Sequence, residues 1–117
     1  MAVTPYQNIQ NLQELEALLL KEKVLLVYFS SDNCTVCKVL KPKIAHLAEE
    51  YFPQMALVSV NVSLAPEVAA NNRVFTIPTV VVFFAGKEYI RKSQSFSLDE
   101  LKNEIGRIYL RMFPKNL

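Results

Sequence analysis

Two cysteines separated by two residues are the part of this sequence best suited to chemistry. Cys34 and Cys37 are the only cysteines among the 117 residues, and the C-x-x-C spacing lets their sulfurs close a small ring. Such a dithiol can reduce a disulfide. One thiolate attacks the disulfide to form a mixed disulfide, and the second thiol then attacks that mixed disulfide and releases the reduced substrate. The pair is therefore a candidate for thiol–disulfide exchange.

The position of the pair in the chain favours this chemistry. The apolar run 24–29 predicts a buried strand, and a helix is predicted to begin at the first cysteine. Unpaired N–H groups and the positive end of the helix dipole stabilise a thiolate there. In C-x-x-C sites the thiol pKa can fall from about 8.5 to about 7, a change of about 2 kcal/mol. We therefore expect Cys34 to be the nucleophile and Cys37, one turn into the helix, to be the resolving thiol.

Other roles for two cysteines carry less weight. A structural disulfide across so short a loop constrains the unfolded chain little. A structural metal site needs about four ligands, and one C-x-x-C pair supplies two unless two chains combine. The only histidine, His46, is interpreted as a solvated or half-buried helix residue. We favour redox exchange over an inactive binding domain and expect no bound metal.

The predicted helices are marked by their first residues. Asn11 and Ser97 each precede a glutamate by three positions, which is the capping-box pattern. The longer helix that is predicted to begin at the first cysteine carries apolar residues from Val36 to Tyr51 and contains Pro42, which we expect to kink it. Pro66 suits the first turn of a short helix that ends near residue 72.

The predicted strands alternate with these helices at first and then form a hairpin. Strands are expected at 24–29, 55–62 and 79–84, and the turn at Gly86 leads into a strand at 87–91. Helical crossovers imply parallel strands, and the hairpin adds antiparallel ones. The fold class is α/β, with a mixed central β-sheet and helices on both faces. Because no repeat or linker interrupts the chain, we expect residues 1–117 to form a single domain.

Bulk composition excludes several classes of protein. A hydrophobic content of 51% with only two glycines excludes a disordered chain, and a net charge of +2 gives no reason to expect nucleic acid as a partner. No apolar stretch reaches the roughly 20 residues of a membrane span. The first six residues lack the pattern of a signal peptide. We expect a cytoplasmic monomer, and in that reducing compartment paired cysteines are more often catalytic or metal-binding than structural.

Several marks along the chain together resemble the thioredoxin family. The C-x-x-C spacing gains specificity from Pro78, which follows Cys37 by 41 residues. The resemblance extends from about Asn11 to Tyr109. The matching residues are Cys34-Thr35-Val36-Cys37-Lys38, Pro42, Thr76-Ile77-Pro78-Thr79 and Gly86.

The resemblance implies a thioredoxin-like fold and a thiol–disulfide oxidoreductase acting on protein disulfides. It implies a cis peptide before Pro78, facing the cysteines, and a backbone there that pairs with an extended substrate segment. We expect the substrate to contact Val36, Phe75, Thr76 and Ile77. By the same resemblance, the redox-active Cys34–Cys37 disulfide replaces any cofactor, and the partners are protein disulfides and a reductase such as thioredoxin reductase.

Departures from the family pattern favour a weak or specialised member over a general reductase. The chain has no tryptophan, and Asn33 stands where the family has one. Thr35-Val36 replaces the usual Gly-Pro, and a late glycine is replaced near Gln94. Thr35, Lys38 and Pro42 are interpreted as residues that modulate the site. The alternative function is a redox-inactive or redox-sensing interaction domain of the same fold.

Tyr28 is the departure with the clearest chemical consequence. It occupies the place of the family's buried acid, and the acid's usual lysine partner aligns with Ser59. A tyrosine with a pKa near 10 is a poor base at neutral pH. We therefore expect slow resolution of the mixed disulfide, unless Tyr28 serves only to fill the core.

Overall fold

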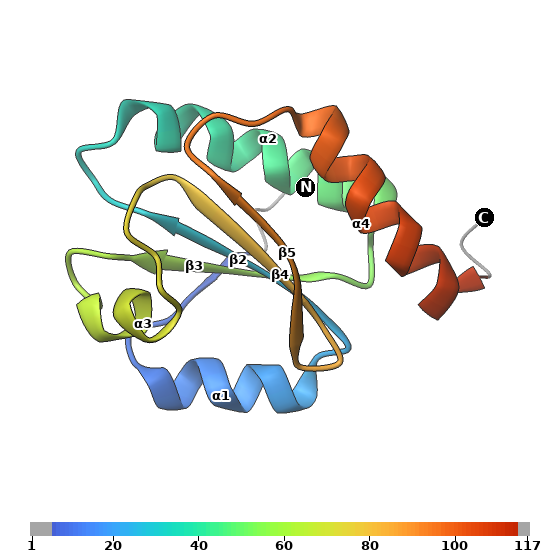
Figure 1. The fold of residues 1–117 in the computed structure, drawn as a ribbon, viewed down its shortest axis with the longest axis horizontal. Coiled ribbons are helices and arrows are strands. Elements are labelled where there is room, and N and C mark those ends of the chain that lie inside the picture. Colours follow the sequence, from blue (N-terminus) through green and yellow to red (C-terminus); the bar gives the residue numbers. More distant parts are fainter. Residues whose placement is uncertain (1–5, 115–117) are drawn as a thin grey trace.

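The structure is a computed structural model that describes residues 6–114. Residues 1–5, where we expect no signal peptide, lie outside the described residues. Helices and strands alternate through most of the chain, and a hairpin precedes the last helix (Figure 1). In chain order the elements are β1 (Tyr6–Asn8), α1 (Leu12–Lys21), β2 (Val24–Ser30), α2 (Thr35–Tyr51), β3 (Ala56–Asn61), α3 (Pro66–Asn71), β4 (Thr79–Phe84), β5 (Lys87–Ser93) and α4 (Leu98–Met112).

The strands form one mixed sheet in the order β1-β3-β2-β4-β5. Strands β1 and β2 both pair with β3 in parallel, whereas β4 is antiparallel to β2 and β5 is antiparallel to β4. Helices α2 and α4 cover one face of the sheet, and α1 and α3 cover the other (Figure 1). This arrangement confirms the predicted thioredoxin-like fold, with its mixed sheet and helices on both faces.

Each face of the sheet has its own apolar core. Alternate residues of the central strand β2 belong to different cores, because successive side chains point to opposite faces. Tyr28 belongs to the same core as Ile44 of α2 and Leu101 of α4, whereas Phe29 belongs to the core on the other face, with Leu15 of α1. Burial on both faces explains why the β2 sequence is continuously apolar.

The helix caps agree closely with the sequence prediction. The Asn11 side chain accepts a hydrogen bond from the backbone N–H of Glu14 at 2.9 Å, and Ser97 accepts one from Glu100 at 3.2 Å. Helix α3 begins at Pro66, as predicted, and ends at Asn71. Helix α2 continues through Pro42 to Tyr51.

The strand β1 is the element that the sequence did not predict. Its three residues are too few to show an alternating pattern of apolar and polar side chains. The predicted strand 55–62 is shorter in the structure, at Ala56–Asn61, and β2 extends one residue further to Ser30. Within residues 6–114, no helix has the length and hydropathy that crossing a membrane requires.

Candidate active site

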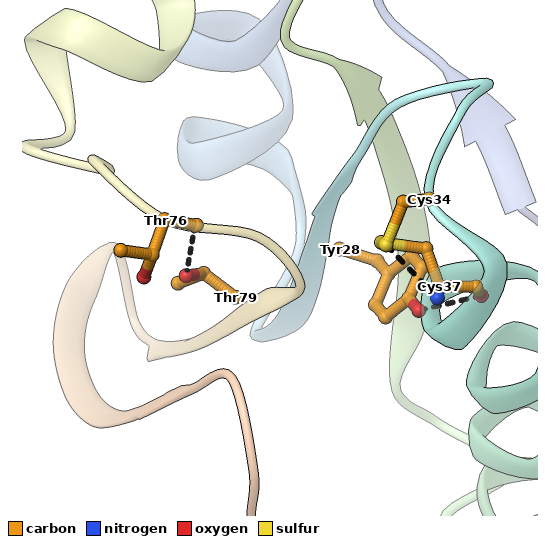
Figure 2. The surroundings of a disulfide bond; sticks show 5 residues. All are labelled: Tyr28, Cys34, Cys37, Thr76 and Thr79. Atoms are coloured by element: carbon orange, nitrogen blue, oxygen red, sulfur yellow. Dashed lines mark hydrogen bonds between the residues drawn. A yellow bond between two sulfur atoms is a disulfide. The ribbon is translucent and has the colours of Figure 1, made fainter.

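The sheet register brings the two predicted parts of the site to the same end of the molecule. Phe29, near the end of β2, pairs with Thr79, the first residue of β4. The segment that follows β2 leads into the cysteines, and the segment that precedes β4 contains Pro78. Figure 2 shows the Thr76–Thr79 turn and the cysteine pair together at this end of the sheet.

Cys34 and Cys37 form a disulfide at the start of α2, with their Cα atoms 5.2 Å apart. Cys34 is the N-cap residue of the helix, and its Sγ accepts a hydrogen bond from the backbone N–H of Cys37 at 3.1 Å. Cys34 is half-buried, whereas Cys37 is only 2% exposed. An incoming disulfide would therefore reach Cys34 first, and the Cys37 N–H would stabilise negative charge on its sulfur.

Tyr28 lies directly beneath Cys37. Its fully buried side chain donates a hydrogen bond from the hydroxyl to the Cys37 carbonyl oxygen at 2.7 Å (Figure 2). Burial raises the pKa of Tyr28 to about 12, so the hydroxyl keeps its proton at neutral pH. Tyr28 is thus both a core residue and a hydrogen-bond donor to the backbone of the cysteine pair.

A second tyrosine extends this arrangement along the helix. The hydroxyl of Tyr6 on β1 donates to the Lys41 carbonyl oxygen at 2.9 Å, and its ring lies 6.1 Å from that of Tyr28, measured between centroids. Burial, and then the proximity of Tyr28, raise the pKa of Tyr6. The two hydroxyls therefore anchor carbonyls one turn apart on α2. Sequence reasoning missed Tyr6, because its contact with α2 spans 35 residues.

Ser59 takes the position of the family's lysine. It lies opposite Tyr28 in the pairing of β2 with β3, and it is only 5% exposed. Its hydroxyl donates to Oδ1 of Asn8 at 3.5 Å. Two hydroxyl side chains, Tyr28 and Ser59, thus stand on paired strands where the family pattern has an acid and a lysine.

The turn before β4 is held by hydrogen bonds at both of its sides. The Ile77–Pro78 peptide is cis, and Pro78 is buried. The Thr79 hydroxyl donates to the Thr76 carbonyl oxygen at 2.7 Å, and the Gln94 N–H donates to the Pro78 carbonyl oxygen at 2.7 Å. Gln94 has a φ of 59°, which is the left-handed conformation that glycine adopts most easily. The glycine of the family pattern is therefore absent at a position that has a glycine-like backbone.

The four predicted contact residues differ in exposure. Phe75 is 84% exposed and Val36 is 60% exposed, while Thr76 is exposed and Ile77 is half-buried against the core. Val39, which sequence reasoning missed, is 54% exposed and follows Val36 by one helical turn. Exposed apolar side chains thus stand on both α2 and the turn before β4.

The three residues predicted to modulate the site all have exposed side chains on α2: Thr35, Lys38 and Pro42. The backbone N–H of Lys38 donates to the Cys34 carbonyl oxygen at 3.2 Å, which is the first helical bond of α2. His46 is also exposed, with its Nε2 3.9 Å from a carboxylate oxygen of Glu50. In the described part of the chain, no three His, Cys, Asp or Glu residues lie close enough together to hold a metal ion.

Comparison with known proteins matches nearly the whole chain. The thioredoxin family model matches residues 7–107. The thioredoxin-like protein YdfQ of Bacillus subtilis is 28% identical over 102 residues, which cover 87% of this chain and 90% of the relative. Thioredoxin 1 of Chlorobaculum tepidum is 29% identical over 84 residues, which cover 72% and 83% respectively. The solved thioredoxin of Fasciola hepatica superposes with a TM-score of 0.77 at 30% identity, covering 86% of this chain and 97% of that one.

Proposed function

Since this chain belongs to the thioredoxin family, whose chemistry is thiol–disulfide exchange, we propose that it reduces disulfides in proteins through Cys34 and Cys37. The observation that carries the proposal is the position of the Cys34 sulfur. Cys34 is the half-buried N-cap residue of α2, and the Cys37 N–H donates a hydrogen bond to its Sγ. That geometry favours a thiolate where a substrate can reach it.

The reaction begins from the reduced dithiol. The Cys34 thiolate attacks one sulfur of the substrate disulfide, that bond breaks, and the second substrate sulfur leaves with the electron pair and takes up a proton. Cys37 then loses its proton and attacks the Cys34 sulfur, which releases the first substrate sulfur as a thiol. The products are a reduced substrate and the Cys34–Cys37 disulfide, and a reductase partner returns two electrons and two protons.

Substrate binding in this proposal uses the turn before β4. The backbone before Pro78 pairs with an extended substrate segment, as a strand added to an edge. Val36, Phe75, Thr76 and Ile77 contact the apolar side chains around the substrate cysteine. Two of these residues, Phe75 and Val36, are more than half exposed, which makes their surfaces available for burial.

The departures from the family pattern support a specialised reductase. In this proposal it works in the cytoplasm as a monomer. Tyr28, a neutral donor at pH 7, leaves the proton of Cys37 to water or to the departing substrate thiolate. Thr35 and Lys38 in the first turn of α2, and Pro42 further along it, then adjust the redox couple. The competing function is an interaction domain whose cysteines do not turn over.

The first experiment measures the equilibrium between dithiol and disulfide in graded glutathione or dithiothreitol buffers, by thiol alkylation and mass. A reversible couple near or below about −250 mV supports a reductase, and one near −150 mV indicates an oxidant or isomerase. Insulin reduction by the wild type is compared with Cys34→Ser and Cys37→Ser. We expect only Cys37→Ser to accumulate mixed disulfides with insulin. The absence of a reversible couple would leave the interaction domain as the function.

A further inference from the structure

Arg91 on the edge strand β5 contacts the backbone that begins the turn before β4. Its Nη2 donates to the Asn72 carbonyl oxygen at 2.8 Å, and its Nη1 donates to the Arg73 carbonyl oxygen at 3.4 Å. The same guanidinium donates twice to the Glu88 carboxylate, from Nε and Nη2, at 2.8 Å each. The planar fork of arginine allows this double engagement, which the single ammonium of lysine does not reproduce.

These contacts fix the first end of one functional segment. We name residues 72–78, between α3 and β4, the substrate loop. Its far end is held from β5 as well, because the Gln94 N–H donates to the Pro78 carbonyl oxygen at 2.7 Å. The strand β5 and the residue that follows it therefore bracket the substrate loop at both ends.

The side chains of the substrate loop hold it unevenly, because Val74 and Pro78 are buried whereas Arg73, Phe75 and Thr76 are exposed. Phe75 at its centre is 84% exposed, so little of its side chain is buried against the core. Arg73 has a φ of 55°, a left-handed conformation that is unfavourable for a residue with a side chain. Arg91 binds the carbonyls of Asn72 and Arg73. Its hydrogen bonds therefore act at the residue whose backbone conformation is unfavourable.

We propose that Arg91, held by Glu88, is a positioning residue that sets the substrate loop in the conformation that accepts a protein disulfide. This rests on the proposed function, because the loop is the segment that pairs with the substrate. Arg91 touches neither cysteine in this arrangement, and its role is confined to the recognition of extended polypeptide. Small disulfides need only the sulfur of Cys34, so the rate of their reduction does not depend on Arg91.

Lys92 offers a matched control on the same strand. It is the next residue and carries the same charge, but it faces α4, where its Nζ lies 2.6 Å from a Glu104 carboxylate oxygen and 3.7 Å from one of Glu100. Arg91 pairs across the sheet with Val81 and Lys92 with Val80, so the two side chains lie on opposite faces. Lys92→Ala therefore removes one positive charge from β5 without touching the substrate loop.

The test compares Arg91→Ala, Arg91→Lys and Lys92→Ala with the wild type. The substrates are insulin and bis(2-hydroxyethyl) disulfide, with the reduction potential measured alongside. We expect both Arg91 variants to raise the KM for insulin by about fivefold or more. The rate on the small disulfide, and the equilibrium constant of the Cys34–Cys37 couple from which the potential is calculated, should stay within about twofold of the wild type. Lys92→Ala is expected to match the wild type in all three.

Hydrogen exchange adds a readout that needs no turnover. The N–H groups of Arg73 and Val74 donate to the carbonyls of Ala70 and Ala69 at 3.0 and 2.9 Å, so both should be protected. They should exchange faster in Arg91→Ala and keep the wild-type rate in Lys92→Ala. An unchanged insulin KM in Arg91→Ala, full rescue by Arg91→Lys, or equal loss on the small disulfide would overturn the proposal. If the wild type reduces neither substrate, the proposed function fails, and the exchange rates alone decide whether Arg91 holds the loop.

Discussion

The buried hydroxyl of Tyr28 and the backbone carbonyl of Cys37 are joined by a hydrogen bond of 2.7 Å. The bond ties α2, the helix that begins at the cysteine pair, to the central strand of the sheet. It also gives the interior of the site a neutral donor at the position where the family pattern has a carboxylate. The proton of Cys37 therefore has no acceptor in Tyr28 at neutral pH, since burial raises the pKa of that phenol to about 12.

Replacing Tyr28 by a carboxylate should speed the second step of the reaction. In Tyr28→Asp, burial raises the pKa of the new carboxyl towards neutrality, and the group can take the proton from Cys37. We expect the mixed disulfide to resolve about tenfold faster or more. Rapid acid quenching and mass spectrometry of the mixed disulfide measure this step, with Tyr28→Asn as a variant of matched size that has no base. Equal rates in the two variants would show that proton removal from Cys37 does not limit resolution.

The two buried tyrosines should make the protein less stable at alkaline pH. Below about pH 10 both the folded and unfolded states keep the phenolic protons, so these groups give no pH dependence. Between about pH 10 and 12 the unfolded chain releases the Tyr28 proton while the folded chain keeps it, so the free energy of unfolding falls as pH rises. The raised pKa of Tyr6 acts in the same direction.

Urea unfolding at pH 9, 10 and 11 checks this prediction in the wild type and in Tyr28→Phe. The variant lacks one of the titrating groups, so its free energy of unfolding should fall less steeply, by about 1 kcal/mol per pH unit at pH 11. Comparing the two proteins cancels the titration of lysines, which they share. Parallel curves for the two proteins would contradict the prediction.

Gln94→Gly should stabilise the fold. Gln94 has a φ of 59°, and a residue with a Cβ pays a steric penalty there that exceeds the entropy lost by introducing glycine. We expect a gain of about 0.5–1 kcal/mol in the free energy of unfolding, measured with urea. Ser95→Gly is the matched control, because Ser95 is next in the chain and does not have a positive φ in the structure. A stability loss in Gln94→Gly as large as that in Ser95→Gly would argue against strain at Gln94.

The parts that could be predicted from the sequence are those set by local patterns. The capping glutamates after Asn11 and Ser97, the continuously apolar β2 and the placement of Cys34 at a helix start all depend on neighbours within a few residues. The contact of Tyr6 with Lys41 and that of Arg91 with Asn72 cross 35 and 19 residues. Such pairs depend on strand order and register, and a continuously apolar strand such as β2 has no alternation of apolar and polar residues that would fix its register.

The left-handed backbone at Gln94 is another feature that tertiary structure sets and local sequence does not predict. The family pattern indicated that a glycine was missing near this position, yet glutamine gives no local signal for a positive φ. In this conformation the N–H of Gln94 donates to the Pro78 carbonyl oxygen at 2.7 Å as the chain leaves β5. Tertiary geometry has overridden the local preference of the residue at this point.

Phe75 should contribute to the capture of protein substrates. It is the one aromatic residue of the substrate loop and is 84% exposed. Burial of an aromatic surface stabilises a complex, whereas burial of an unpaired carboxylate opposes it. In a Cys37→Ser background, Phe75→Asp should lower the yield of mixed disulfide with insulin by about fivefold or more. Tyr89→Asp is the control, because Tyr89 is 57% exposed and lies on β5 near the hairpin turn, away from Cys34. Quantitative non-reducing electrophoresis gives both yields, and equal capture by the Phe75 and Tyr89 variants would remove Phe75 from the substrate surface.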